Sequence, residues 1–472
     1  MTKKYSTRFS LLIILPVLGL TSLFLYLHQH TTFARSANTV TVNTLQDEED
    51  GSCQDGDCSL RDAIETANSG DLILFDVSGV IDISPFGILS VTKDLMINGN
   101  NQITISGNNS TNIFEFVPIE PNSGEEIAFT IEGLTFTKAT GDFGSVIRTY
   151  RSVVTVTINN SQFINNSAND GIITTSSTSP IIINNSSFVD NISTNTGGVI
   201  FTSGEVEIYN SLFLNNRAKF GGAIYNVGST TIHNSQFLHN QAEVGGAITS
   251  GSPGDITIAN STYAYNESSV SGGAIHNFGL MSIVNSTISS NIASNFGGGI
   301  YYTVSDFPDL ELINSTVTNN QAGNNGGGIY FSKHNEPIDV VNTIISGNYL
   351  SSSMSANDFT EVPAFTSSAN NISVVSHGHN VIGHIEGNVI GFETDSSDRL
   401  NTFNIKIGPL EESSTNLLVH IPMKDSFLLN SGNTEFCPEF DQLGAKRGTL
   451  CDIGAVERLN QELFISVVRS SN

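Results

Sequence analysis

The side chains best able to do chemistry in this chain are carboxylates at equivalent positions of successive sequence repeats. Glu311 and Asp339 occupy the same outward position in neighbouring repeats, and Asp306, Asp309 and Glu336 flank them. Two carboxylates about 5 Å apart suit either a calcium site or a retaining pair of catalytic acids. The calcium candidates are therefore Asp309, Glu311 and Asp339. Glu311 and Asp339 are also the only catalytic candidates, and solvated carboxylates on an acidic surface are the alternative interpretation.

A second pattern is a stripe of mostly aromatic residues at one fixed position of the repeat. From repeat to repeat this position holds Thr174, Phe201, Tyr225, Thr249, His276, Tyr301 and Tyr330. Exposed aromatic faces at regular spacing can stack on sugar rings, with hydrogen bonds from neighbouring Asn and Ser side chains. Good strand propensity is the alternative explanation for Tyr on a β-surface. The predicted glycan-binding residues are Tyr225, His276, Tyr301 and Tyr330.

Two other polar groups have structural explanations that we favour. His377-Gly378-His379 lies outside the regular repeats, which favours a structural role over the chemistry of similar motifs in polysaccharide hydrolases. The acidic run at 47–50, with Asp55 and Asp57, has calcium-type ligands, but charged residues beside a cap are usually solvated. The sequence holds no Ser-His-Asp set, P-loop or dinucleotide fingerprint.

The repeat that must position these residues recurs about every 25 residues. It begins with an Asn, usually followed by Ser, at Asn160, Asn185, Asn210, Asn234, Asn260, Asn285, Asn314 and Asn342. A second Asn follows six places later, at Asn166, Asn191, Asn216, Asn240, Asn266, Asn291, Asn320 and Asn348. Asn tolerates the left-handed backbone of sharp bends, and interior Asn side chains can hydrogen-bond from coil to coil. Both series are therefore predicted to be structural ladders.

Three short apolar segments occur in each repeat, separated by Asn and Gly. They are centred on residues such as Ile208, Phe213 and Ile224, and no segment is long enough for a helix. Three strands per coil, stacked on the same strands of the next coil, form an all-β parallel β-helix solenoid. We expect about 11 coils over residues 71–350. The glycines Gly222, Gly246, Gly273, Gly298 and Gly327 are predicted at bends where a side chain would collide.

Charge and the N-terminal segment indicate an exported protein. The net charge of −26 opposes binding to nucleic acid or to anionic lipid headgroups. Basic residues precede an apolar run from Phe9 to Leu27, which is typical of an export signal. Residues 1–36 are thus expected to be a signal peptide or an uncleaved N-terminal membrane anchor, because about 20 apolar residues can span a bilayer. The protein is expected outside the cell or at its surface, either free or tethered by residues 9–27.

Four cysteines form two local pairs near the ends of the chain. Cys53 with Cys58 and Cys437 with Cys451 are predicted disulfides, because disulfides are the usual fate of cysteines in exported proteins. Neither pair has His at zinc-finger spacing, so no metal or cofactor is expected apart from the calcium alternative. Solenoid ends need covering, which predicts an N-terminal cap at 37–70, with a helix near Arg61–Asn68, and a C-terminal cap region at 351–472.

Both terminal regions resemble known families. Cys58-Ser59-Leu60-Arg61-Asp62-Ala63-Ile64 resembles the CSLREA signature of exported bacterial β-helix proteins. His379-Asn380-Val381-Ile382-Gly383 and Cys451-Asp452-Ile453-Gly454-Ala455-Val456-Glu457 resemble the choice-of-anchor Q type domain of surface proteins. The repeats are similar to those of chlamydial polymorphic outer-membrane proteins. These resemblances imply a right-handed β-helix that is exported, and they assign no activity.

Taken together, these patterns predict an exported bacterial surface or secreted β-helix without catalysis, acting in adhesion or glycan binding. The partner would be a polysaccharide or cell-surface glycan. A polysaccharide lyase or glycoside hydrolase on the same scaffold is the alternative. A groove with a basic residue beside Glu311 and Asp339 would favour the enzyme, and a flat acidic face there would favour binding.

Overall fold

The computed structural model describes residues 38–117, 126–149, 153–303, 310–332, 338–351, 365–367, 374–383, 392–393, 395–402 and 404–459. The predicted signal or anchor at 1–36 lies outside these ranges. Within them, no helix has both the length and the apolar character needed to cross a membrane.

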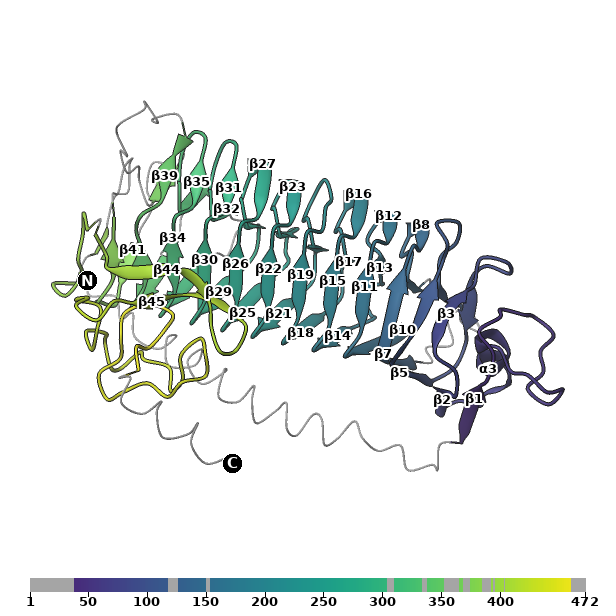
Figure 1. Cartoon of the computed structure of the whole chain (residues 1–472). Coiled ribbons are helices and arrows are strands. Elements are labelled where there is room, and N and C mark those ends of the chain that lie inside the picture. The colour runs from purple at the N-terminus through teal and green to yellow at the C-terminus, as the bar shows by residue number, and fades with distance from the viewer. Residues whose placement is uncertain are drawn as a thin grey trace, which may run out of the picture.

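The described chain forms a parallel β-helix, a rod of stacked coils (Figure 1), as the sequence predicts. Each regular coil passes through four ladders of parallel strands, and ladders 1 and 2 belong to one bent sheet. Ladder 1 contains β1 (Thr39–Val42), β2 (Asp71–Phe75), the first parts of β5 (Leu95–Ser106) and β7 (Glu126–Thr137), β10 (Val153–Asn159), β14 (Ile181–Asn184), β18 (Val206–Tyr209), β21 (Thr230–His233), β25 (Ile256–Ala259), β29 (Met281–Val284), β33 (Leu310–Ile313), β37 (Ile338–Val341), β41 (Val374–Ser376) and β43 (Phe392–Glu393).

Ladder 2 contains β3 (Gly79–Asp82), the second parts of β5 and β7, β11 (Gln162–Ile164), β15 (Ser187–Val189), β19 (Leu212–Leu214), β22 (Gln236–Leu238), β26 (Thr262–Ala264), β30 (Thr287–Ser289), β34 (Thr316–Thr318), β38 (Ile344–Ile345) and β42 (Val381–Ile382). Ladder 3 contains β8 (Thr140–Phe143), β12 (Ser167–Asp170), β16 (Ile192–Thr196), β23 (Gln241–Val244), β27 (Glu267–Ser271), β31 (Ile292–Ala293), β35 (Gln321–Ala322) and β39 (Tyr349–Leu350).

Ladder 4 closes the coil before the chain rises to the next one. It contains β4 (Leu89–Val91), β6 (Phe114–Phe116), β9 (Ile147–Thr149), β13 (Ile173–Thr174), β17 (Ile200–Thr202), β20 (Ile224–Asn226), β24 (Ile248–Ser250), β28 (Ile275–Asn277), β32 (Ile300–Thr303), β36 (Ile329–Ser332) and β40 (Phe365–Ser367). Ladders 1, 2 and 4 carry the three apolar segments seen in the sequence. Ladder 3 is an additional short strand, because its inward residues are small, such as Ala168, Ser193 and Ala322, and give no apolar signal.

The interior of the rod is a continuous column of apolar side chains. Along ladder 2, the rings of Phe163, Phe188, Phe213 and Phe237 are fully buried and stack with centroids 4.5–4.7 Å apart. Tyr263 continues this stack at 4.8 Å. Burying such a ring is worth about 2–3 kcal/mol. The column therefore holds successive coils in vertical register.

Both Asn series have the structural roles that the sequence predicts. The first series forms bend 1, the corner between ladders 1 and 2, where φ lies between +43° and +52° from Asn160 to Asn342. The second series points inward. Asn216, for example, accepts hydrogen bonds at Oδ1 from the main-chain N and Nδ2 of Asn191, and its own Nδ2 donates to Asn240 Oδ1 and to Phe188 O. An interior polar column is thus fully hydrogen-bonded along the rod.

Bends 2 and 3 complete the corners of the coil. Bend 2 joins ladders 2 and 3, and its residues, including Asn165, Asn215 and Asn319, also have positive φ. Bend 3 joins ladders 3 and 4 through a glycine pair. A Cβ on Gly222 would meet the carbonyl oxygen of Gly246 in the next coil, which confirms that a side chain collides there.

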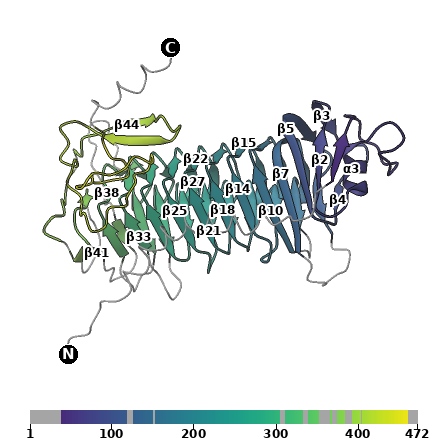
Figure 2. The same ribbon diagram turned by 90° about the horizontal axis from the view of Figure 1, so that it is seen from below.

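The two ends of the rod are covered differently. At the first coil, helix α3 (Leu60–Thr66) follows the N-cap Ser59 and buries Leu60, Ala63 and Ile64 in the core, and the Cys53–Cys58 disulfide lies beside it. At the other end, strands continue past residue 350 as far as β43, later than the expected boundary. Residues 404–459, the C-terminal module, contain the second disulfide, Cys437–Cys451, and the antiparallel hairpin β44 (Ile407–Glu412) and β45 (Leu418–Pro422). This hairpin lies beside the coils (Figure 2), where we expected an end cap.

We predict that Asn216→Ala lowers the free energy of unfolding by about 3 kcal/mol or more. The change removes the partner of the Asn191 main-chain N–H and of the Phe188 carbonyl inside the rod, and one of the two acceptors of Asn191 Nδ2. Urea unfolding followed by circular dichroism measures this. Asn215→Gly is the control, since it removes an exposed neighbouring Asn and keeps the positive φ. Equal stability of the two variants would contradict the role of the interior amide column.

Candidate functional site

The predicted carboxylate pair lies on the outer face of ladder 1. Glu311 of β33 and Asp339 of β37 are register partners on adjacent coils, as the repeat alignment predicts. Asp339 Oδ1 lies 2.7 Å from His377 Nε2, and Glu311 Oε2 accepts a hydrogen bond of 3.0 Å from Ser282 Oγ. Each carboxylate therefore has a local partner. His377 and Asp339 are both about one quarter exposed, and His377 also packs on Phe436 of the C-terminal module.

Asp306, Asp309 and Glu336 lie outside the described residues. In the part of the chain that the structure describes, no group of three His, Cys, Asp or Glu side chains could hold a metal ion. Calcium binding at Asp309, Glu311 and Asp339 stays a prediction, as does the catalytic alternative for Glu311 and Asp339.

The aromatic stripe is a real column on the outer face of ladder 4, with its members paired in register from Thr174 to Tyr330. Its first cluster contains Phe201 and Tyr225, with centroids 5.9 Å apart, and Phe220 from ladder 3, which meets the Tyr225 ring edge-on at 6.5 Å. The Lys219 ammonium lies 5.4 Å from the Phe220 ring centroid. All three rings are half-buried, so part of each faces solvent.

A second aromatic cluster follows after Thr249. His276 packs between Phe278 at 4.7 Å and Tyr301 at 4.4 Å, and Tyr330 packs against Phe296 at 4.7 Å and Tyr301 at 5.2 Å. As a result, His276 is only 6 % and Tyr330 only 7 % exposed, whereas Tyr301 is half-buried. The stripe is therefore not an open platform at His276 and Tyr330, because neighbouring rings cover their faces. Tyr225 and Tyr301 are the predicted residues that remain accessible.

Burial gives His276 an unusual charge state. Loss of solvent lowers the pKa of its imidazole from 6.5 to about 3, so the ring is neutral at pH 7. Its Nδ1 lies 3.1 Å from Ser271 Oγ. A neutral, stacked imidazole supports the aromatic cluster as packing and offers no cation to a ligand.

The C-terminal module docks on bend 1. The Nδ2 atoms of Asn285, Asn314 and Asn342 donate to main-chain carbonyls of the module at Phe440, Asp452 and Asn433 respectively, over 2.7–3.3 Å. The buried guanidinium of Arg447 donates to Asn285 Oδ1 and to Glu457 Oε2. Gln442 hydrogen-bonds Thr262 and Thr287 on ladder 2. The bend Asn side chains thus serve as a seat for polypeptide main chain.

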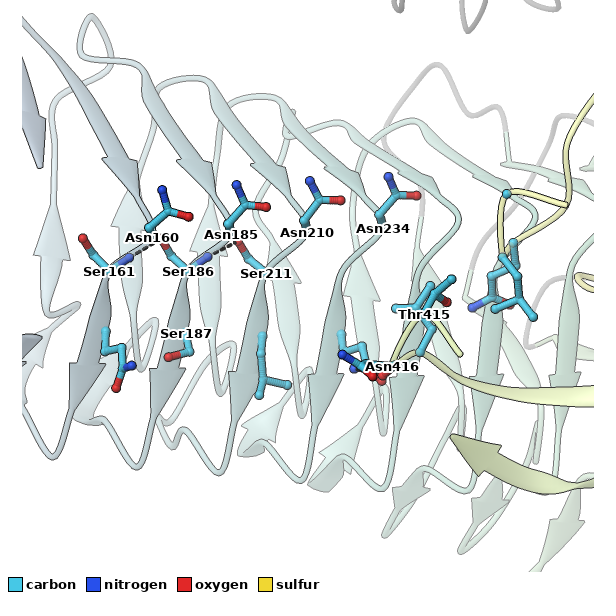
Figure 3. Close-up of a pocket in the computed structure, with 17 residues that line it drawn as sticks. Asn160, Ser161, Asn185, Ser186, Ser187, Asn210, Ser211, Asn234, Thr415 and Asn416 are labelled. Carbon is cyan, nitrogen blue, oxygen red and sulfur yellow. Dashed lines mark hydrogen bonds between the residues drawn. The ribbon is translucent and has the colours of Figure 1, made fainter. Parts of the chain in front are cut away.

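Bend 1 is open on the N-terminal side of the module, where a groove of about 570 Å³ runs along the coils (Figure 3). Its floor is the Ser column, in which each hydroxyl accepts from the main-chain N of the previous coil, as between Ser161, Ser186 and Ser211. The hairpin loop at Thr415–Leu417 and the turn at Leu443–Gly444 close one end. Its lining residues are all uncharged: Asn160, Ser161, Gln162, Asn185, Ser186, Ser187, Asn210, Ser211, Leu212, Asn234, Gln236, Thr415, Asn416, Leu417, Gln442, Leu443 and Gly444.

The sequence alone assigned these bend residues a structural role and missed the groove. The repeat did hold one indication of a polar surface here. The second Asn of each repeat points inward, so the amide of the first Asn, at the bend, must point away from the interior. What closes the groove could not be anticipated, since Gln236 contacts Asn416, which is 180 residues away.

Two segments of the chain match repeats of a known family. Residues 210–227 and 314–332 match the Chlamydia polymorphic membrane protein repeat, as the sequence resemblance predicts. The crystal structure of pectate lyase Pel9A is similar over 90 % of this chain and 98 % of that chain, with 13 % identity and a TM-score of 0.31. No curated protein matches the chain. The CSLREA and choice-of-anchor resemblances stay predictions.

Acid should destabilise the ladder 4 face through His276. The unfolded imidazole, with a pKa near 6.5, binds a proton more readily than the folded one, so stability falls as the pH drops below about 6.5 toward 3. At pH 5 the cost is about 2 kcal/mol. We predict that His276→Phe loses less stability than the wild type between pH 7 and pH 5, measured by urea unfolding. His239→Asn, at an exposed position with positive φ, is the control. An undiminished loss in His276→Phe would contradict this assignment.

Docking of the module should depend on single bend amides. Asn342 exchanges hydrogen bonds with the main-chain N and O of Asn433, so Asn342→Gly removes both while keeping the positive φ of 50°. We expect amide hydrogen exchange within residues 430–457 to become about tenfold faster. The matched control is Asn210→Gly, at the same bend but outside the module seat; unchanged exchange in Asn342→Gly would refute the seat.

Proposed function

We propose that this chain is an exported, non-catalytic cell-surface or secreted β-helix that binds glycans on the outer face of ladder 4. The observation that carries the proposal is the pair of aromatic clusters around Tyr225 and Tyr301. These two tyrosines share one face of a straight column and are separated by three coil steps, about 14 Å. Half-buried rings held by packing are preorganised, so little entropy is lost when a sugar ring stacks on them.

Charge narrows the ligand class. A net charge of −26 repels polyanionic polysaccharides, and the Lys219 ammonium beside the first cluster already packs on the Phe220 ring. Neutral glycans, with Tyr hydroxyls and nearby polar groups as hydrogen-bonding partners, are therefore the favoured ligands. Export is supported by the apolar run at Phe9–Leu27, by the two disulfides and by the similarity of the repeats to those of Chlamydia polymorphic membrane proteins.

A polysaccharide lyase or glycoside hydrolase is the alternative function, and it rests on Glu311 and Asp339. His377 lies beside Asp339, which gives this pair a titratable neighbour. Both carboxylates are held by local contacts on the outer face of ladder 1, and the uncharged groove on bend 1 lies elsewhere. The aromatic face therefore supports binding better than this pair supports catalysis.

The test is binding of the full chain to an array of neutral and acidic glycans. We predict that Tyr225→Ala combined with Tyr301→Ala weakens binding to neutral glycans about tenfold or more, because both stacking faces are lost. Tyr225→Phe with Tyr301→Phe should retain most of the affinity, since the rings persist.

Tyr265→Ala is the matched control, because Tyr265 is an exposed tyrosine on bend 2, away from ladder 4. Undiminished glycan binding by the double Ala variant would remove the proposed site. Cleavage of any array polysaccharide that disappears in Glu311→Gln or Asp339→Asn would establish the enzymatic alternative instead.

A further inference from the structure

The seat of the C-terminal module covers only part of bend 1. Asn285, Asn314 and Asn342 are buried beneath the module, and each donates to one of its main-chain carbonyls. Asn185, Asn210 and Asn234 belong to the same column and are exposed. Within the described residues, these three side chains form no hydrogen bond. Figure 3 shows their amides projecting side by side from the bend, so the open part repeats the chemistry of the occupied part.

Ladder 2, beside the bend, also has one residue type both in contact with the module and exposed in the open part of the groove. At one end of the groove, Gln236 Nε2 donates to the Asn416 carbonyl over 2.8 Å, and Gln236 Oε1 accepts from the Leu418 main-chain N over 3.1 Å. This side-chain amide therefore pairs with the hairpin as another peptide group would. Gln162 occupies the same register position three coils away, at the other end of the groove, and it is exposed.

The groove has the composition of a main-chain receptor. All its lining residues are uncharged, which argues against phosphate, carboxylate or metal ligands. Primary amides offer both a donor and an acceptor, which matches the C=O and N–H groups of an extended chain. The open groove is also continuous with an interface in which the same residue type already holds main chain.

We propose that the open part of bend 1, with Gln162 beside it, is a docking site for an extended segment of a partner polypeptide. The amides of Asn185, Asn210 and Asn234 hold its main-chain carbonyls, as their counterparts hold the module. Because the contacts are to main chain, recognition depends on an extended, accessible backbone more than on particular side chains. The site is separate from the glycan-binding face proposed on ladder 4.

The experiment selects a phage-displayed library of linear 12-residue peptides on the full chain, and measures enriched synthetic peptides by calorimetry. We expect enriched peptides to bind Asn185→Gly/Asn210→Gly/Asn234→Gly about tenfold or more weakly than the wild type. Glycine keeps the positive φ of these positions, so the bend is preserved while the amides are lost. Replacing peptide bonds of the ligand by esters should weaken binding more than replacing its side chains by Ala.

The matched control is Asn165→Gly/Asn215→Gly/Asn319→Gly, which removes three exposed amides with positive φ from bend 2. This control, like Tyr225→Ala/Tyr301→Ala, should bind the peptides as the wild type does. The proposal is overturned if the wild type captures no peptide from the library, or if the captured peptides bind the bend 1 variant undiminished. It is equally overturned if that variant loses glycan binding instead, or if light scattering shows a wild-type dimer that the variant breaks.

Discussion

The interior column of Asn amides is the interaction on which the other features of the rod depend. Each side chain accepts two hydrogen bonds from the preceding coil and donates one to the next, so one residue per coil is fixed in height and in angle around the axis. Coils of different length obey the same constraint, since the separation is 24 residues from Asn216 to Asn240 and 29 from Asn291 to Asn320. Extra residues are accommodated outside this column. Irregular loops therefore do not change the register of the coils, and equivalent residues on the outer surface also stack in columns.

The regular register explains which features of the rod could be predicted from the sequence. The positive φ at bend 1, the inward second Asn and the burial of Phe188, Phe213 and Phe237 follow from local residue chemistry repeated many times, and all were predictable. Ladder 3 was not, because Ala and Ser at its inward positions carry no apolar signal. Its strand pairing is set by the neighbouring ladders, which is a property of the assembled coil.

The candidate sites show a similar limit. Sequence spacing correctly aligned Tyr225, His276, Tyr301 and Tyr330 in one column, but it could not give their exposure. Rings from other positions, such as Phe278 and Phe296, decide which faces reach solvent. The contact between the C-terminal module and bend 1 is even harder to predict from the sequence, because Asn285 and Arg447 are 162 residues apart in the chain. Contacts of that kind depend on where a non-repetitive segment comes to rest, and periodicity carries no information about it.

The contact between glycines at bend 3 has a consequence for how such a rod can change over generations. Because a Cβ on Gly222 would strike the carbonyl of Gly246, each coil dictates what its neighbour can carry at that corner. Replacing a single glycine there causes a clash with the adjacent coil. Duplication or loss of one entire coil, in contrast, places a glycine pair against a glycine pair again. Such a molecule can grow or shorten in whole units of height, and every added unit would lengthen the amide row and the aromatic row together.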